Sequence, residues 1–502
     1  MRYTLLIFFV WFFHFLSAQS VALDHDIWLR MDQLKGDFDP NYSFTARPLI
    51  QKDSSKSSVN ILPIRISTKF NSHSPYGWND AGMVMSKGLQ TMVSAGVYAK
   101  WGRLSVQLQP EFYYAANSPY PTTVGYGYNS GKSFQKTYLG QSAIKLNLGA
   151  VAIGLSSQNN WWGPGQFSSI MMSNNAPGFN HITINSNKPI KTAIGHFEFQ
   201  LVMGRFNEDT SMAFENNYMR PLNPRNEGRY FNGIVASYQP KWLSGFFLGV
   251  SRTEQIYLSD QALKSGFATK YLPVLQASSP IDNANTNSIP TDGAFSFFTR
   301  WLIPQHQIEF YAEYAYNDFK QNLRDLSVNT SHAAAFMLGF NKLIPHIESD
   351  IDWLISGEIT QMSQSTSMML RNAGNYYRHF SITQGATFQN QILGAGSGLG
   401  NNLQTLQLKR IKGSSFLGLK LQRIQNDPVA DPIGLNGPVN SFGVRPIKWS
   451  DFSIGFLGSK QFNQWRINAE IQLVNRKNYG WEKGNAFNLF SQINGQYFFK
   501  RK

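Results

Sequence analysis

The chain has 502 residues, with 45 Lys and Arg against 30 Asp and Glu, 42% hydrophobic residues and no cysteine. Charged residues make up 15% of the chain, below the roughly 25% of soluble domains, and aromatic residues make up 14%, too many for a disordered chain. The composition excludes disulfide scaffolds, thiol nucleophiles and cysteine-ligated zinc, and it disfavours an ordinary cytosolic enzyme.

The N-terminus has the features of a secretory signal. Arg2 supplies a positive charge, residues 5–16 form an apolar run, and Leu16-Ser17-Ala18 precedes Gln19 as a cleavage site would. The alternative is a membrane anchor, but the apolar run is shorter than the ~20 residues that span a bilayer. We therefore expect residues 1–18 to be a signal peptide, and loss of Arg2 would leave a net charge of +14.

Residues 19–60 differ from the rest of the chain. Apolar and polar residues recur there at helical spacing before Gly36, namely Asp26, Trp28, Leu29, Met31 and Leu34. Residues 53–58 resemble a linker. We expect a small N-terminal periplasmic helical element, followed by a barrel over residues 61–502.

From about residue 90 to the C-terminus, segments alternate between apolar and polar residues with a period of two. Clear cases cover residues 104–112, 197–203, 308–317, 417–422 and 466–473. A half-buried strand of a soluble sandwich would also alternate, but no linker divides these segments into separate domains. In lipid, only a closed barrel lets strands satisfy all their backbone hydrogen bonds.

At roughly 22 residues per strand and loop, this region would supply about 18 strands. We therefore predict an all-β fold, a transmembrane outer-membrane antiparallel β-barrel of about 18 strands closed by residues 487–499. Short turns such as residues 240–245 alternate with long stretches such as residues 255–293 and 361–404. Bacterial barrels place long loops outside the cell, so these two stretches are expected at the cell surface.

One segment between strands stands out. Asn159-Asn160-Trp161-Trp162 is followed by Gly163-Pro164-Gly165 and then by Asn174 and Asn175. Sugar rings stack on aromatic side chains while their hydroxyls pair with amides, so a sugar site is one interpretation. The other is a structural turn or an aromatic anchor at the lipid interface.

Motifs for enzymes fail on spacing. The glycines of residues 394–400 do not complete a G-x-G-x-x-G pattern, and Gly131-Lys132-Ser133 lacks the first glycine of a phosphate-binding loop. The eight histidines beyond the signal are not paired at metal-ligand spacing. We predict no catalytic residues, no metal and no cofactor, and no nucleic-acid partner for an exported protein.

Three blocks of the sequence resemble the outer-membrane capsule assembly proteins of the Wzi type. The W-W-G-P-G and S-N-N-A-P stretches, residues 161–165 and 173–177, are similar to the family's most recognisable motif, and residues 309–318 to its acidic barrel strand. Residues 376–379, with Gly385 and Gln391, resemble its Y-x-H…G…Q…L-G block. The resemblance extends from about residue 60 onward, and the N-terminus looks shorter than the family's helical bundle.

This resemblance implies a monomeric barrel that binds capsular or extracellular polysaccharide and helps assemble or anchor it at the cell surface, as a lectin and not as a catalyst. The expected ligand-binding residues are Asn159, Asn160, Trp161, Trp162, Asn174, Asn175, Tyr376, Tyr377, Arg378 and His379. Outer-membrane lipid is a further expected partner, periplasmic export machinery is a candidate one, and the positive charge would attract acidic polysaccharide or lipid phosphate. A porin-like channel for small solutes or oligosaccharides remains the alternative.

Overall fold

The structure is a computed structural model. It describes residues 23–48, 57–120, 131–207, 225, 227–276, 289–317, 330, 333–346, 350–363, 376–379, 381–382, 384–426 and 447–499. The expected signal peptide lies outside these residues. No helix in the described ranges is long and apolar enough to cross a membrane.

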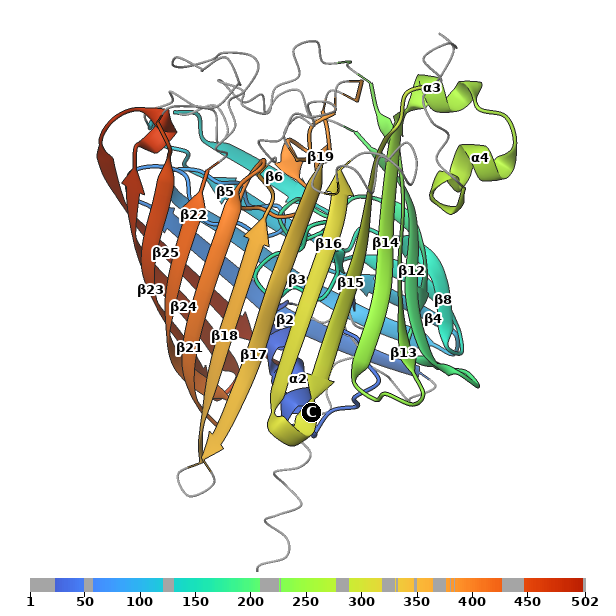
Figure 1. Cartoon of the computed structure of the whole chain (residues 1–502), viewed down its shortest axis with the longest axis horizontal. Coiled ribbons are helices and arrows are strands. Elements are labelled where there is room, and N and C mark those ends of the chain that lie inside the picture. Colours follow the sequence, from blue (N-terminus) through green and yellow to red (C-terminus); the bar gives the residue numbers. More distant parts are fainter. Residues whose placement is uncertain are drawn as a thin grey trace, which may run out of the picture.

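Most of the described chain is β-strand (Figure 1). The first half contains β1 (Ala46–Arg47), β2 (Ser57–Asn71), β3 (Gly88–Trp101), β4 (Leu104–Leu108), β5 (Glu111–Ala115), β6 (Phe134–Tyr138), β7 (Ala143–Leu148), β8 (Val151–Ser156), β9 (Trp161–Trp162), β10 (His181–Ser186), β11 (Ile190–Lys191), β12 (Gly195–Phe206) and β13 (Arg229–Pro240). The second half contains β14 (Phe246–Tyr257), β15 (Asp292–Ile303), β16 (Ile308–Asn317), β17 (Ala334–His346), β18 (Ile351–Gln361), β19 (Thr387–Phe388), β20 (Gln391–Ile392), β21 (Asn402–Lys412), β22 (Ser415–Gln425), β23 (Ser450–Phe462), β24 (Trp465–Lys477) and β25 (Asn485–Tyr497). The helices are α2 (Leu23–Lys35), α3 (Leu258–Leu263) and α4 (Phe267–Tyr271), with 3-10 turns η3 (Pro273–Leu275), η4 (Pro304–His306) and η5 (Tyr479–Trp481).

All of these segments except β1, β9, β19 and β20 close into one antiparallel barrel of 18 strands. Its sheet contains 21 segments, of which β4 and β5 both pair with β3, β10 and β11 both pair with β12, and β6 and β7 lie along β5 and β4. Each of these three pairs is therefore one interrupted strand. The ring closes where β2 pairs with the last strand, β25, from Ile64 opposite Tyr497 to Asn71 opposite Phe490. The predicted barrel, its strand number and its closing strand are confirmed.

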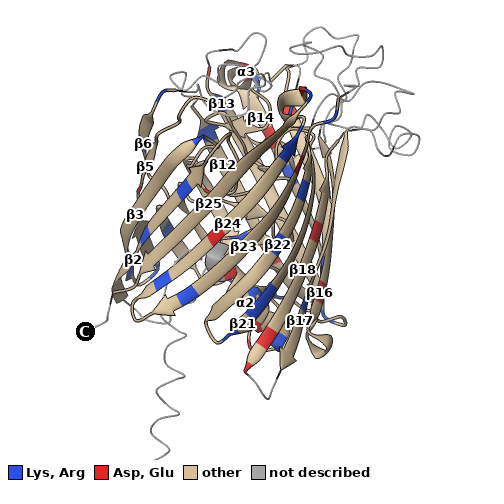
Figure 2. Cartoon of the chain, turned by 90° about the vertical axis from the view of Figure 1, so that its left-hand side faces the viewer, with Lys and Arg blue, Asp and Glu red and all other residues tan. Residues whose placement is uncertain are grey.

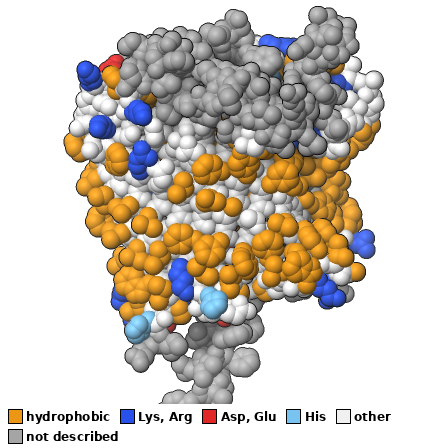
Figure 3. All heavy atoms as spheres, in the orientation of Figure 1, with side chains coloured by type: hydrophobic (Ala, Val, Ile, Leu, Met, Phe, Trp, Pro, Cys, Tyr) orange, Lys and Arg blue, Asp and Glu red, His pale blue; other side chains and the backbone are white. Residues whose placement is uncertain are grey.

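The alternating faces are those that the sequence predicts. On β22, Leu417, Leu419 and Leu421 are exposed on the outside, whereas Gln422 is buried in the interior. On β16, Phe310 is exposed while Glu309 is fully buried. Figure 3 shows apolar side chains covering the barrel wall below its upper rim. A wall with apolar side chains outside and polar side chains inside suits lipid on the outside.

The two ends of the barrel differ in the length of their connections. Two-residue turns join β3 to β4, β21 to β22 and β23 to β24 at one end, where the described chain also starts and finishes. The described parts of the two long predicted stretches lie at the other end, and the first of them includes α3 and α4 (Figure 1). We assign the long-loop end to the cell surface and the short-turn end to the periplasm.

The predicted N-terminal helix is present as α2, and it lies inside the periplasmic mouth of the barrel (Figure 1). Its apolar residues Met31 and Leu34 pack in one cluster with Leu302, Leu343, Leu354 and Ile411, which are near the periplasmic ends of four strands. The first barrel strand then begins at Ser57.

Charged residues fasten this N-terminal segment to the inner wall. Figure 2 marks the basic and acidic residues along the ribbon of α2 and of the strands. The Arg30 guanidinium lies 2.9 Å from Oε1 of Glu309, and Arg300 binds the other oxygen of the same carboxylate. Arg300 also donates to Gln33 Oε1 at 2.7 Å. Since Arg30, Arg300 and Glu309 are all buried, these charges hold α2 in one position.

Candidate functional site

The double-tryptophan segment lies inside the barrel. Trp161 and Trp162 form β9, which pairs with Ala46 and Arg47 of β1 in a separate two-stranded sheet. Both side chains are buried, at 3% and 0% exposure. The lipid-interface alternative is therefore wrong, because these rings face protein and not the bilayer.

Trp162 is a packing residue of the interior. Its Nε1 donates to Gln200 Oε1 at 2.8 Å, and its ring belongs to an apolar cluster with Phe179 and Phe231. Gly233 on β13 allows the ring to reach the wall, since a Cβ at that position would lie 2.6 Å from Trp162 Cη2. A fully buried ring has no face left for a sugar to stack on.

Trp161 has a different environment. Its Nε1 donates to the carbonyl of Gly165 at 3.2 Å, and the guanidinium of Arg47 lies 4.8 Å from the ring centroid. Arg47 itself donates to the same carbonyl at 2.8 Å. Burial lowers the pKa of Arg47 to about 9, although Asp26, 3.8 Å away, opposes the shift. One ring face is thus occupied by a cation in the present arrangement.

Trp161 borders two polar cavities in the lumen, of about 150 and 190 Å³. Both cavities are also lined by Asp26, Arg47 and Asn79. Three more of the predicted site residues, Asn159, Asn160 and Asn174, line the smaller one with Trp161. The two cavities together have room for several water molecules, at ~30 Å³ each.

The asparagines have mixed roles. Asn160 accepts a hydrogen bond from Gln200 Nε2 at 2.8 Å, while its buried Nδ2 donor has no hydrogen-bond partner among the described residues. Asn159 donates to the carbonyl of Ala176 at 2.6 Å, and Asn174 to that of Asn79 at 3.3 Å. Asn159 and Asn174 therefore stabilise loop backbone and border the cavity at the same time.

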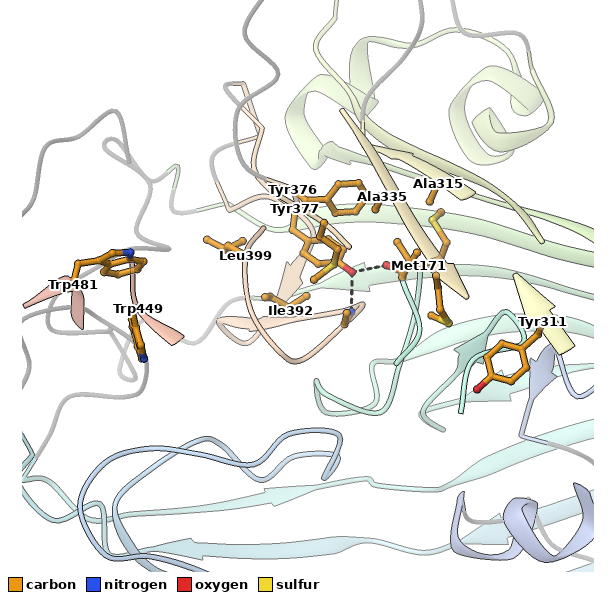
Figure 4. Close-up of a cluster of buried hydrophobic side chains, with 14 residues drawn as sticks. Met171, Tyr311, Ala315, Ala335, Tyr376, Tyr377, Ile392, Leu399, Trp449 and Trp481 are labelled. Carbon is orange, nitrogen blue, oxygen red and sulfur yellow. Dashed lines mark hydrogen bonds between the residues drawn. The ribbon is translucent and has the colours of Figure 1, made fainter. Parts of the chain in front are cut away.

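The second predicted block lies in the long connection between β18 and β21. Tyr377 donates to the carbonyl of Ile170 at 2.7 Å and accepts from the N–H of Ala395 at 2.8 Å (Figure 4). Tyr376 is buried beside it, and burial raises the pKa of both phenols. Gly394 is required here, because a Cβ would lie 2.2 Å from the Ile170 carbonyl oxygen.

Arg378 and His379 are half-buried in the same connection. His379 Nδ1 accepts from the backbone N–H groups of Ser381 and Ile382, at 3.2 and 3.0 Å, and so caps a turn. Asn317 at the end of β16 donates to the carbonyl of Arg378 at 3.2 Å. These contacts tie the block to the barrel wall.

The two blocks meet, but not as one pocket. Ser173 donates to the carbonyl of Gly394, and Asn175 Nδ2 to that of Ile392 at 3.0 Å, so the loop after the tryptophans packs on the β18–β21 connection. Tyr376 and Tyr377, however, lie in a different apolar cluster from Trp162. Together the blocks form an inward-folded plug, which we define as residues 157–179 and 384–401.

Sequence reasoning missed the residues that hold this plug. Glu358 on β18 accepts from the N–H groups of Gln166 and Phe167, at 2.7 and 3.1 Å, and so anchors the Gly-Pro-Gly turn. Gln200 on β12 likewise holds Trp162 and Asn160. The alternation of their strands marks Glu358 and Gln200 as inward-facing polar residues, and this was the signal that could have found them. It does not identify their partners, which are about 40 to 190 residues away along the chain. In the described residues, no group of three His, Asp or Glu is placed to hold a metal ion.

The sequence matches the family model described as capsule assembly protein Wzi over residues 60–466. A comparison with curated proteins gave no match. Among solved structures, the chain is similar to Wzi, an outer-membrane protein involved in group 1 capsule assembly in Escherichia coli and described as a carbohydrate-binding β-barrel, with 13% identity, a TM-score of 0.61 and coverage of 94% of this chain and 98% of that chain.

More distant similarity extends to outer-membrane channels. OprB of Pseudomonas putida is 12% identical with a TM-score of 0.38, covering 88% of this chain and 94% of its own, and OccK2 of Pseudomonas aeruginosa is 7% identical with a TM-score of 0.40, covering 88% and 97%. The chain is an outer-membrane β-barrel protein. Because the family model matches well over half of its length, the chain belongs to the Wzi family of capsule assembly proteins.

Proposed function

We propose that this protein binds capsular or extracellular polysaccharide and helps to assemble or anchor it at the cell surface, without catalysing a reaction. The observation that carries the proposal is the family match over residues 60–466. The plug supports it, because its two loops fold into the lumen and are joined to each other by hydrogen bonds. The Escherichia coli relative is described as carbohydrate-binding, which agrees with the same role.

We propose that the predicted ligand-binding residues have different roles. Asn159, Asn160 and Asn174 line the lumen cavity, and their amides suit sugar hydroxyls because they both donate and accept hydrogen bonds. Trp162 and Tyr377 are buried and shape the plug. Arg378 and His379 belong to the extracellular connection and are the more accessible candidates for first contact with a polysaccharide.

The experiment is to titrate the purified, folded barrel with labelled capsular polysaccharide from the same organism. Saturable binding by the wild-type protein is expected. The Asn160→Ala variant should bind less polysaccharide per folded barrel. Trp162→Phe should instead lower the yield of folded barrel and have a smaller effect on the polysaccharide bound per folded barrel. Absence of binding by well-folded wild-type protein would refute the proposal.

A porin-like channel is the second candidate, and the two polar lumen cavities are the observation that favours it. Planar-bilayer conductance separates the two. Steady ion current through the wild-type barrel, without polysaccharide binding, would replace the first proposal with the second.

The ends of the chain carry a related proposal. We infer that residues 1–18 are removed on export and that residues 19–60 serve the periplasmic side, where export machinery is the candidate partner. Mass spectrometry of the membrane form should find Gln19, or a residue within a few positions, at the N-terminus, and an intact Met1 would contradict this.

A further inference from the structure

The outer wall carries a sharp polar boundary at the extracellular ends of β21 to β25. Residues paired across neighbouring strands form rows around the wall. One such row on the outer face of β22 to β25 is wholly apolar and exposed, and it consists of Leu421, Ile454, Leu473 and Leu489. One step towards the cell surface, the next row contains Arg423, Phe452, Asn475 and Phe487. The row beyond it contains Lys477. The first outward cation of this wall above the apolar row is therefore Arg423, beside the exposed aromatic residue Phe452.

Two of these outward cations lie close enough to act together. Arg423 and Lys477 are on strands two apart and differ by two residues in height. With strand spacings of ~4.8 Å and a rise of ~3.4 Å per residue, their Cα atoms are roughly 12 Å apart, within joint reach of one headgroup. Lys448 and Lys483, on the loops above, are exposed as well. We call Arg423, Lys448, Lys477 and Lys483 the rim patch.

The rim patch is not neutralised within the described structure. Arg423 donates to two amide oxygens, Gln404 Oε1 at 2.8 Å and Gln425 Oε1 at 3.3 Å. Among the described residues no carboxylate forms an ion pair with any of its four cations, and this includes Glu482 in the loop next to Lys483. Figure 3 shows basic side chains gathered at this upper edge of the barrel.

The opposite wall behaves differently. There, Arg252 pairs with Glu254 at 3.4 Å and Arg225 with Asp260 at 2.8 Å. Cations near the extracellular rim of β13 to β15 are thus compensated within the protein. Among the described residues, the rim patch therefore differs from the opposite wall in having no carboxylate partner.

We propose that the rim patch binds the phosphate groups of a phosphorylated glycolipid in the outer leaflet of the membrane. The position favours lipid, because Arg423 stands directly above exposed Leu421 and beside Phe452, which would contact the acyl chains. An Arg and a Lys at the headgroup level can both form charge-assisted hydrogen bonds with phosphate. The bound lipid orients this side of the barrel in the leaflet, and the proposal does not depend on polysaccharide binding.

The test uses the full barrel in nanodiscs that contain either the phosphorylated outer-leaflet glycolipid or the same glycolipid after removal of its phosphates. Native mass spectrometry counts the bound lipids. The wild-type protein should retain the phosphorylated form selectively, and retention should fall with rising salt. The variant with Arg423→Gln and Lys477→Gln should lose about fivefold in affinity for each cation removed.

The matched control is the variant with Arg410→Gln and Lys412→Gln. These residues are also exposed and outward-facing, but on the periplasmic end of β21, so retention should be unchanged. A second variant, with Arg423→Lys and Lys477→Arg, keeps both charges. It should retain the lipid as the wild-type protein does, which would exclude a folding defect as the cause of the loss. Equal retention of the dephosphorylated lipid, an equal loss in the control variant, or a loss that affects only soluble acidic polysaccharide would each overturn the proposal.

Discussion

Trp161 and Trp162 are neighbours in the chain and have opposite surroundings. Because they belong to a strand, their side chains point to opposite faces. Trp162 points into the apolar cluster against β13, and Trp161 points to Arg47 and the polar cavities. One motif thus supplies both an anchor for the plug and a wall of the lumen.

Replacing these rings should separate the two roles. Trp162→Ala removes a fully buried ring and its bond to Gln200, so the free energy of unfolding should fall by about 3–5 kcal/mol. Trp161→Ala should cost less, because its ring already borders the cavities. Thermal unfolding in detergent, followed by circular dichroism, measures both, and equal losses would contradict the assignment.

At this scale the sequence identified the unusual residues but not their partners. The W-W-G-P-G stretch was recognisable by composition, and three of the amides that line the smaller cavity, Asn159, Asn160 and Asn174, were among the predicted residues. Arg47 on the ring of Trp161 could not be foreseen, because the two residues are joined only through the pairing of β1 with β9, which no local pattern encodes.

Among the elements, the strands were the most predictable. Residues such as 417–422 and 466–473 alternate because lipid and lumen impose opposite demands on successive side chains. The helix α2 was also predictable from its spacing, but its place inside the barrel was not. That place depends on Arg30 and Arg300 meeting one carboxylate about 280 residues from the helix.

Glu309→Gln should release α2 from the wall. The substitution leaves Arg30 and Arg300 buried without their anion, and breaking such a pair costs about 3–5 kcal/mol. Protease cleavage within residues 23–48 of the folded barrel should therefore become faster. Lys35→Gln is the control, since its bridge to Asp352 is partly exposed and contributes about 0–1 kcal/mol. Unchanged protection in Glu309→Gln would show that apolar packing alone holds the helix.

The same segment should loosen at high pH. Burial, with the charges of Glu198 and Asp39, raises the pKa of Tyr42 to about 12. The neutral phenol stabilises the folded state fully below its ordinary pKa of ~10, and this contribution is lost as the pH rises through about 12. Tyrosinate absorbance should show a late-titrating phenol that disappears in Tyr42→Phe. A Tyr42 that titrates with the exposed tyrosines would contradict the burial.

For the whole molecule, two obstructions in series fill the lumen. Residues 23–48 lie towards the periplasmic mouth and the plug lies towards the long-loop end, and the two meet where β1 pairs with β9. Deleting residues 23–40 alone, which spares β1 and its pairing with β9, should therefore raise planar-bilayer conductance only slightly, and replacing residues 166–176 by a short Gly-Ser linker as well should produce a large rise. A large rise from the first deletion alone would show that the plug is permeable.

The pairing of β2 with β25 has a consequence for how the molecule is made. The two strands that close the ring are separated by nearly the whole chain, so the seam can form only after the last strand has been synthesised and delivered to the membrane. Residues 23–48, which precede β2, contact buried charged residues of β12, β15 and β16: Glu198 accepts from the Ser43 N–H, Arg300 donates to Gln33, and Glu309 pairs with Arg30. Those partners come together only as the sheet curls, so the N-terminal segment must enter through a ring that is still open or through its periplasmic mouth. The last step of assembly is therefore the pairing of β2 with β25, which closes the barrel around residues 23–48.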